Sequence, residues 1–317
     1  MKILANDGIA PIGKKNLETG NFEVITDFVP QDELIKSIND NNYVGLLVRS
    51  ATTVRKDLID ACPGLKLIGR GGVGMDNIDV EYARSKGIQV INTPAASSQS
   101  VAEKVMAHLF SMSRSLYDAH RRMPGEGHTE FKALKKRYGK GIELRGKTIG
   151  IVGFGRIGQK VAKYALGCGM KVIAFDPYVK EALIIVEVAE FKVNVTIKPV
   201  SLDEILANSD FITMHVPMLE GGKAVITKAE FSKMKDGVII VNAARGGVID
   251  EQDLIDNLDN GKVAHAALDV FVNEPNPRED LLTHPKISAT PHIGAATVEA
   301  QDRIGEELAE QIITYFK

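Results

Sequence analysis

Short runs of apolar residues, many of them β-branched, alternate along the chain with longer segments in which apolar residues recur every three or four positions. The short runs have the composition of buried strands, and the longer segments, such as 31–39 and 80–86, have the spacing of amphipathic helices. Strands and helices in this alternation favour parallel sheets with helices on both faces, so the pattern predicts an α/β fold. The predicted strands are residues 2–5, 43–48, 67–69, 89–92, 148–152, 171–175, 211–214, 238–242, 264–268 and 287–290.

A long helical segment, residues 97–122, separates these strands into two groups. Its apolar residues Val101, Val105, Leu109 and Met112 recur at spacings of four, four and three, so they keep to one face. This spacing predicts one long, largely uninterrupted helix that crosses between two domains. We expect the helical tail at 297–315 to return to the first group of strands. The first domain would then be discontinuous, with residues 1–96 and 290–317, around a second domain of residues 97–289.

Two segments fit this plan less well. Residues 123–145 are rich in Gly, Lys and Arg and lack a clear period, which predicts a loop with a broken helix. Residues 182–200 are rich in β-branched residues, and the sequence assigns them no function.

The composition excludes several classes of protein. The chain has 317 residues, about two domains of ordinary size, and its net charge is −2. So small a charge offers no global field for nucleic acid or for an anionic lipid surface. The two cysteines lack a metal-ligand spacing, and no apolar run reaches the ~18 residues of a membrane span. We therefore expect a cytoplasmic protein with no metal, nucleic acid or membrane as partner.

The clearest motif is Gly153-Phe154-Gly155-Arg156-Ile157-Gly158, which fits the pattern G-x-G-x-x-G. It follows a predicted strand and opens an amphipathic helix, as a dinucleotide site requires. Gly153 permits the tight turn, Gly155 lets backbone N–H groups approach a pyrophosphate, and Gly158 allows the helix to pack closely on the sheet. Arg156 is placed to reach the pyrophosphate, although a solvated arginine fits the sequence nearly as well.

The second half of this nucleotide unit is Asp176, which ends the next strand 23 residues after the first glycine. Its carboxylate is expected to accept hydrogen bonds from the adenosine ribose and to repel a 2′-phosphate, which predicts NAD rather than NADP. The alternative is a tight turn followed by an ordinary surface aspartate.

Three polar segments follow later strands: Asn242 to Gly247, Asp269 to Pro275 and Thr290 to Ala295. Hydride transfer to or from a hydroxyl-bearing carbon needs a group that exchanges the hydroxyl proton, which suits histidine. It also needs a partner for the substrate carboxylate, which suits arginine, and a carboxylate that orients the histidine. Composition alone does not select these segments from the many other charged residues of the chain.

Together with the nucleotide unit, these segments resemble the D-isomer-specific 2-hydroxyacid dehydrogenase family over essentially the whole chain. The resemblance implies two doubly wound parallel-sheet domains, with a Rossmann cofactor domain inserted into a flavodoxin-like substrate domain. It implies that Arg245 binds and polarises the substrate, and that Glu274 pairs with His292, the proton donor and acceptor. Around the NAD cofactor we expect, besides the glycine motif, the residues Ile157, His215, Val216, Pro217, Ala244, Asp269 and Gly294.

Within that family, the segments Leu47 to Thr52 and Gly69 to Asn77 most resemble the phosphoglycerate dehydrogenase branch. The resemblance implies that the loop formed by Gly71, Gly72, Val73 and Gly74 presents backbone N–H groups to the substrate carboxylate. Arg49 and Ser50 are then candidates for a distal phosphate, together with Arg70 or the basic segment 132–140. Arg49 is alternatively an ordinary surface arginine.

The expected reaction is the NAD-dependent oxidation of 3-phospho-D-glycerate to 3-phosphohydroxypyruvate, the first step of L-serine biosynthesis. A glyoxylate or hydroxypyruvate reductase of the same family is the main alternative, and an NAD-sensing corepressor is a weaker one. Because apolar residues cover much of the 97–122 helix, we expect a homodimer that forms through it. The chain stops after its last predicted helix, so we expect a short form without a C-terminal regulatory domain and without inhibition by serine.

Overall fold

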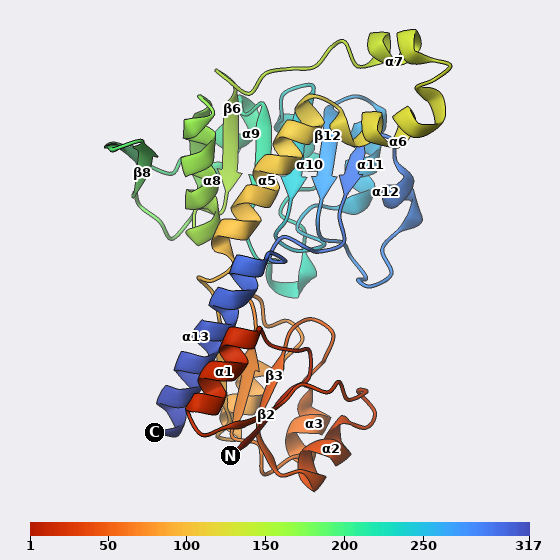
Figure 1. Ribbon diagram of the computed structural model, residues 1–317. Helices are drawn as coiled ribbons and strands as arrows, with labels where there is room; N and C mark the ends of the chain where they lie inside the picture. The colour runs from red at the N-terminus through yellow and green to blue at the C-terminus, as the bar shows by residue number, and fades with distance from the viewer. The chain divides into compact units, whose positions relative to one another are not determined.

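The computed structural model describes residues 1–317, apart from the side chain of Glu220. The chain divides into two compact units, residues 1–100 with 295–317 and residues 101–294 (Figure 1). We call them the first unit and the second unit. The predicted fold class is confirmed, because each unit is built on a parallel sheet covered by helices. None of the helices in the described part of the chain combines the length and the apolar character that crossing a membrane takes.

The first unit contains a five-stranded parallel sheet in the order β2-β1-β3-β4-β5, which is the flavodoxin-like order. Its strands are β1 (Lys2–Ala5), β2 (Glu23–Ile25), β3 (Tyr43–Val48), β4 (Leu67–Arg70) and β5 (Gln89–Asn92). Its helices are α1 (Pro11–Thr19), α2 (Leu34–Asp40), α3 (Lys56–Ala61), α4 (Val80–Ser85) and α13 (Val298–Phe316).

The C-terminal helix α13 belongs to the core of the first unit. Its residues Ile304, Leu308 and Ile312 are buried in one apolar cluster with residues of β1 and α1. Figure 1 shows α1 and α13 side by side. They cross at Gly13 and Gly305, where a Cβ on Gly13 would lie 2.6 Å from the Cα of Gly305. The helical tail therefore returns to the first group of strands.

The second unit contains a six-stranded parallel sheet in the order β13-β12-β11-β10-β6-β7. Its strands are β6 (Thr148–Val152), β7 (Lys171–Phe175), β10 (Phe211–Met214), β11 (Val238–Asn242), β12 (Val263–Leu268) and β13 (Ile287–Ala289). Beside α5, α6 and α7 described below, its helices are α8 (Arg156–Gly167), α9 (Leu202–Asn208), α10 (Lys228–Lys233), α11 (Glu251–Asp259), α12 (Glu279–Thr283) and the 3-10 turn Glu220–Gly222. All residues of β10 and β11 are buried, as expected for strands covered on both faces.

The prediction of one uninterrupted helix over 97–122 is wrong. The segment forms α5 (Ser98–Ser113) and α6 (Leu116–Glu126), which are separated at Ser115 in a left-handed conformation with φ of 51°. The carbonyl of Ser113 at the end of α5 accepts the N–H of Ile142 instead of continuing the helix. The broken helix predicted after it is present as α7 (Phe131–Arg137). The apolar periodicity correctly predicted helix on both sides of Ser115. It did not predict the break, where the carbonyl of Ser113 bonds to Ile142.

The β-rich segment after Asp176 forms a separate antiparallel hairpin of β8 (Ala182–Val188) and β9 (Phe191–Ile197). A classic dinucleotide sheet has a further strand outside the second one. Here that position is reduced to one bond, from the N–H of Val200 to the carbonyl of Ala174 in β7. The base of the hairpin is buried against α8, whereas Phe191 near its tip is 67% exposed. Figure 1 shows the hairpin projecting beside α8.

Candidate active site

The strands of the second unit are parallel, so their carboxyl ends lie at one edge of the sheet, where such sheets bind ligands. The glycine motif follows β6, and Asp176 follows the neighbouring strand β7. Arg245, Glu274 and His292 follow β11, β12 and β13, which are also neighbours. The order of the sheet therefore gathers the predicted cofactor and reaction residues at the same edge.

The glycine loop requires glycine at two positions and leaves a third one open. Gly153 has a φ of 96°, and a Cβ on it would lie 2.4 Å from the carbonyl oxygen of His215. A Cβ on Gly158 would lie 2.2 Å from the carbonyl oxygen of Gly153. At Gly155, in contrast, a Cβ would meet nothing within 4 Å. The open position caps the N-terminus of α8, where backbone N–H groups and the helix dipole favour a pyrophosphate.

Asp176 is fixed against this loop by backbone groups. Its Oδ2 accepts the N–H of Phe154 at 2.8 Å, and its Oδ1 accepts the N–H groups of Tyr178 and Val179 at 2.8 and 3.2 Å. A carboxylate has about four acceptor positions, so capacity for a ribose hydroxyl remains. The sequence predicted the ribose contact but missed that Asp176 also holds the glycine loop.

His215 lies directly after β10, beside the glycine loop. Its Nε2 is 3.0 Å from the hydroxyl of Thr213, and its buried Nδ1 has no hydrogen-bond partner among the described residues. Burial lowers the pKa of His215 to about 3, so its ring is neutral. A buried nitrogen without a partner requires a water or a ligand atom. Together with the open position at Gly155, it fits a bound dinucleotide.

His292 and Glu274 form a hydrogen-bonded pair at this edge. The Nδ1 of His292 lies 2.7 Å from Oε2 of Glu274, whose Oε1 accepts the N–H of Phe271 at 2.9 Å. Burial raises the pKa of Glu274, but these two hydrogen bonds and the nearby Arg245 outweigh it and hold the pKa below its usual value. The carboxylate is thus ionised and faces Nδ1, which leaves Nε2 as the nitrogen that can exchange a proton with a substrate.

Arg245 is held on a loop that packs against the segment bearing Glu274. Its Nη1 donates to the carbonyl of Ala244, and its own carbonyl accepts the side-chain amide of Asn242. A Cβ on Gly246 would lie 1.9 Å from the carbonyl oxygen of Phe271. Since the loops approach at van der Waals distance, the guanidinium of Arg245 and the carboxylate of Glu274 act on each other electrostatically. Asn242 is a further positioning residue that the sequence did not single out.

Asp269 is buried beneath the segment that carries His292. Its Oδ1 accepts the hydroxyl of Thr290 at 2.5 Å and the N–H of Ile293 at 3.0 Å, and its Oδ2 accepts the N–H of Gly294 at 2.7 Å. The carboxylate therefore ties together the residues on both sides of His292. Its predicted position near the nicotinamide stays a prediction.

In the first unit, Arg49 and Ser50 follow β3 in a turn that two side chains hold. Asp7 accepts the N–H of Arg49 at 2.6 Å and the hydroxyl of Thr52 at 2.5 Å. Asn77 donates to the carbonyls of Arg49 and Thr52 at 2.8 and 2.7 Å. The sequence missed Asp7 and Asn77, although Asp7 shows the usual signal, a polar residue just after a buried strand.

The neighbouring loop after β4 carries Gly71, Gly72, Val73 and Gly74. Gly72 has a φ of 148°, its carbonyl accepts the N–H of Thr93, and the carbonyl of Val73 accepts the side-chain amide of Asn92. A Cβ on Gly72 would lie 1.9 Å from Nη1 of Arg70, and a Cβ on Gly71 would lie 3.5 Å from Cγ of Arg49. The two arginines therefore lie against adjacent residues of one glycine turn.

The basic segment 132–140 lies elsewhere. It forms α7 and its flanks, where Asp118 of α6 pairs with Arg137 and accepts the hydroxyl of Tyr138. The hydroxyl of Tyr117 in α6 donates to the carbonyl of Pro285, just before β13, so α6 lies at the amino ends of the strands. Figure 1 shows α7 on the side from which the strand arrows point away. His292 of the same chain follows β13 and lies at the opposite edge of the sheet. The segment 132–140 therefore does not contact a substrate bound at His292 of its own chain.

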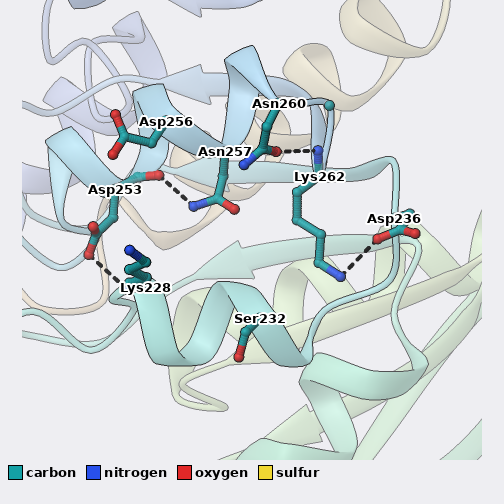
Figure 2. A pocket seen from close by; sticks show the side chains of 9 residues that line it. Lys228, Ser232, Asp236, Asp253, Asp256, Asn257, Asn260 and Lys262 are labelled. Atoms are coloured by element: carbon teal, nitrogen blue, oxygen red, sulfur yellow. Dashed lines mark hydrogen bonds and ion pairs between the residues drawn. The ribbon is translucent and has the colours of Figure 1, made fainter.

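A polar pocket of about 700 Å³ lies between α10 and α11 (Figure 2). Lys262 and Asp236 pair across it at 2.8 Å, and Asp253 accepts the backbone N–H of Lys228. Lys262 precedes β12, so this part of the pocket lies at the amino ends of the strands. None of the candidate site residues lines it. Throughout the part of the chain that the structure describes, no cluster of three or more His, Cys, Asp or Glu side chains is arranged to hold a metal ion.

A parallel sheet with a glycine-lined dinucleotide loop and a histidine–carboxylate pair at one edge defines the class of nicotinamide-dependent dehydrogenases. Residues 106–294 match the family model described as the NAD-binding domain of D-isomer specific 2-hydroxyacid dehydrogenases. The chain belongs to the D-isomer specific 2-hydroxyacid dehydrogenase family, and its cofactor is NAD.

Relatives with different activities are similar to this chain. The hydroxypyruvate reductase of Thermotoga maritima is 47% identical over 92% of this chain and 90% of that protein. The D-3-phosphoglycerate dehydrogenase of Methanocaldococcus jannaschii is 44% identical over 98% of this chain, which spans only 57% of that longer protein. A glyoxylate reductase structure from Paecilomyes thermophila has a TM-score of 0.83 at 28% identity, covering 100% of this chain and 95% of that one. The relatives therefore agree on the family and differ in the substrate.

Proposed function

We propose that this protein oxidises 3-phospho-D-glycerate to 3-phosphohydroxypyruvate with NAD, the first step of L-serine biosynthesis. The observation that carries the proposal is the placement of Arg49 and Arg70 against Gly71 and Gly72. A substrate with one carboxylate is satisfied by the N–H groups of such a turn or by one guanidinium. Where the N–H groups of the turn bind the carboxylate, the guanidinium of Arg49 remains for a second anion, which a phosphate provides.

In this proposal each unit has a distinct task. Arg49, Ser50 and Arg70 bind the phosphate, and the loop from Gly71 to Gly74 binds the carboxylate through backbone N–H groups. Arg245 polarises the oxygen at the reacting carbon. Bound NAD supplies the hydride acceptor, and the glycine motif, Asp176 and His215 are the residues that hold it.

His292 takes the hydroxyl proton as the hydride leaves. Its Nε2 is the free nitrogen because Nδ1 faces Glu274. The imidazolium that forms is stabilised by the negative charge of the Glu274 carboxylate, 2.7 Å away. Donation of the same proton from Nε2 supports the reverse reduction.

The second candidate function is the reduction of hydroxypyruvate or glyoxylate, which the 47% identity to the Thermotoga maritima enzyme favours. Such substrates carry no phosphate, so with their carboxylate bound by the loop from Gly71 to Gly74, Arg49 would have no second anion to bind. The two functions therefore differ in what Arg49 contributes.

We test this by comparing kcat/KM for 3-phosphoglycerate, D-glycerate and D-lactate, followed by NADH formation. A charge-assisted phosphate contact favours 3-phosphoglycerate by roughly 10- to 100-fold. Arg49→Ala should remove most of that preference through KM, while the control Arg84→Ala, at an exposed ion pair with Glu81 in the same unit, should change nothing. Equal or better turnover of D-glycerate, with no effect of Arg49→Ala, would contradict the proposal.

We also propose that the chain forms a homodimer through the segment 97–122. Phe110 of α5 and Leu116 of α6 are 48% and 56% exposed, which is unusual for side chains of this size. Light scattering should give twice the mass of the chain, and Phe110→Lys should lower it. A cytoplasmic location and insensitivity to serine stay predictions.

A further inference from the structure

His108 on α5 is a buried titratable residue next to the reaction centre that the proposed function does not use. Only 4% of its surface is exposed. Its Nε2 lies 3.3 Å from the hydroxyl of Thr290, and its Nδ1 lies 3.4 Å from the hydroxyl of Ser288. Burial, together with the nearby charge of Lys104, lowers the pKa of His108 to about 4, so the ring is neutral under physiological conditions.

The contacts of Thr290 connect this histidine to the segment that carries His292. The hydroxyl of Thr290 donates to Asp269, 2.5 Å away. Asp269 in turn accepts the N–H groups of Ile293 and Gly294. Thr290 precedes His292 by two residues, and Ile293 and Gly294 follow it. Asp269 therefore holds the chain on both sides of His292 through hydrogen bonds to Thr290, Ile293 and Gly294, an arrangement that we call the clamp. His108 contacts Thr290, at one end of it.

The hydrogen bonds determine which ring nitrogen of His108 carries the proton. The single hydroxyl hydrogen of Thr290 is used on the Asp269 carboxylate, so toward His108 this oxygen can only accept. His108 must then donate from Nε2, and its Nδ1 accepts from Ser288. The neutral Nε2–H form satisfies every one of these groups, and the lowered pKa keeps the ring in that form.

The backbone of His292 depends on this clamp. His292 has a φ of 51°, a left-handed conformation that a residue with a side chain rarely adopts unless its surroundings fix it. Those surroundings are the Asp269 hydrogen bonds on both sides. The same conformation presents the imidazole to Glu274.

We infer that His108 is a positioning residue for the dehydrogenase reaction. By donating to Thr290, it directs the hydroxyl hydrogen of Thr290 onto Asp269 and thereby holds the 290–294 segment in the conformation that sets His292 against Glu274. This inference rests on the proposed role of His292 as acid and base, and it is independent of which 2-hydroxy acid the enzyme prefers.

The test measures kcat and KM for the best 2-hydroxy acid substrate in a set of variants of the full chain. His108→Leu fills the space without a donor, and we expect kcat to fall by about tenfold, the value of one ordered hydrogen bond in the site, with KM for NAD unchanged. His108→Gln keeps an N–H donor at the reach of Nε2 and should restore kcat to within about threefold of the starting protein. A purely structural role would lower the melting temperature in both variants without this difference in kcat.

A double-mutant cycle separates action through Thr290 from a direct effect. Thr290→Val removes the hydroxyl and should lower kcat more than His108→Leu does, whereas Thr290→Ser keeps it and serves as the matched control. If His108 acts through Thr290, adding His108→Leu to Thr290→Val causes no further loss of kcat. Multiplicative losses in the double variant, or a normal kcat in a folded His108→Leu protein, would overturn the inference. If no variant or parent oxidises 3-phosphoglycerate but all reduce hydroxypyruvate, the proposed substrate fails and this test still stands.

Discussion

All seven histidines of the chain lie between residues 101 and 294, and the first unit contains none. The candidate ligand groups of the first unit are arginines and backbone N–H groups, whose charge does not change near neutral pH. In the second unit, His292 is paired with Glu274, while His108 and His215 are buried and neutral. In the proposed function, the first unit therefore recognises the substrate through groups that do not titrate near neutral pH, and the second unit exchanges the proton of the reaction.

The glycine turns of the two units differ in a related way. In the second unit, Gly153 and Gly158 face backbone atoms, which cannot move aside. In the first unit, a Cβ on Gly71 would meet the Ile304 side chain at 3.2 Å, and one on Gly72 would meet the Arg70 side chain. Side chains can rearrange where backbone cannot. We therefore expect the turn with Gly153 and Gly158 to tolerate substitution less well than the turn with Gly71 and Gly72.

The largest expected effect separates the two tasks most directly. In His292→Ala, kcat should fall by about 10²- to 10⁴-fold because the proton acceptor is lost. The affinity for NAD, measured by fluorescence titration, should stay nearly unchanged, because the glycine loop and Asp176 are intact. The exposed His128→Ala is the control and should behave like the parent protein. Equal losses of kcat and of NAD affinity would instead assign a structural role to His292.

The next effect concerns acid stability. His108 and His215 have native pKa values of about 4 and 3, whereas an unfolded histidine has a pKa near 6.5. Below pH 6.5 the unfolded chain therefore binds protons that the native second unit does not, so stability falls as the pH falls. At pH 5 the loss is about 2 kcal/mol for each histidine.

Denaturant unfolding without NAD at pH 7.5 and pH 5 measures this loss, and hydrogen exchange locates it. The second unit should lose protection first. His108→Gln should reduce the loss of stability between pH 7.5 and pH 5 by the contribution of one histidine. Equal loss of protection in both units would show that they unfold together, and no pH dependence would contradict the buried neutral state.

The smallest effects compare the two glycine turns. Gly158→Ala should lower the free energy of unfolding by about 1–3 kcal/mol, because its Cβ meets a backbone oxygen at 2.2 Å. Gly71→Ala should stay within about 1 kcal/mol, because Ile304 can shift by a few tenths of an ångström. Gly167→Ala in α8 has open space around its Cβ and controls for helix propensity. Equal destabilisation at positions 71 and 158 would remove the distinction between the turns.

The parts of the site that depend on local pattern could be predicted from sequence. The glycine motif and Asp176 lie within one strand–helix–strand unit, so spacing alone is informative. The strand ends before Arg245, Glu274 and His292 were also visible, but their chemistry needed the family resemblance, because any polar residue can follow a strand.

The supporting contacts could not be predicted because they join distant segments. Asp7 meets the Arg49 turn across 42 residues, and His108 meets Thr290 across 182. The break at Ser115 likewise depends on the contact between Ser113 and Ile142. Helical periodicity records which face of a segment is apolar, and it carries no information on where another part of the chain will interrupt it.

The place of α13 in the first unit has a consequence for biosynthesis. During synthesis residues 1–100 emerge before the second unit, but the apolar cluster that contains Ile3, Leu17 and Leu47 is completed by residues of α13. The second unit is contiguous and can complete its core earlier. We expect the first unit to stay incomplete until synthesis has passed the second one, so that α13 ends its exposure to chaperones and proteases.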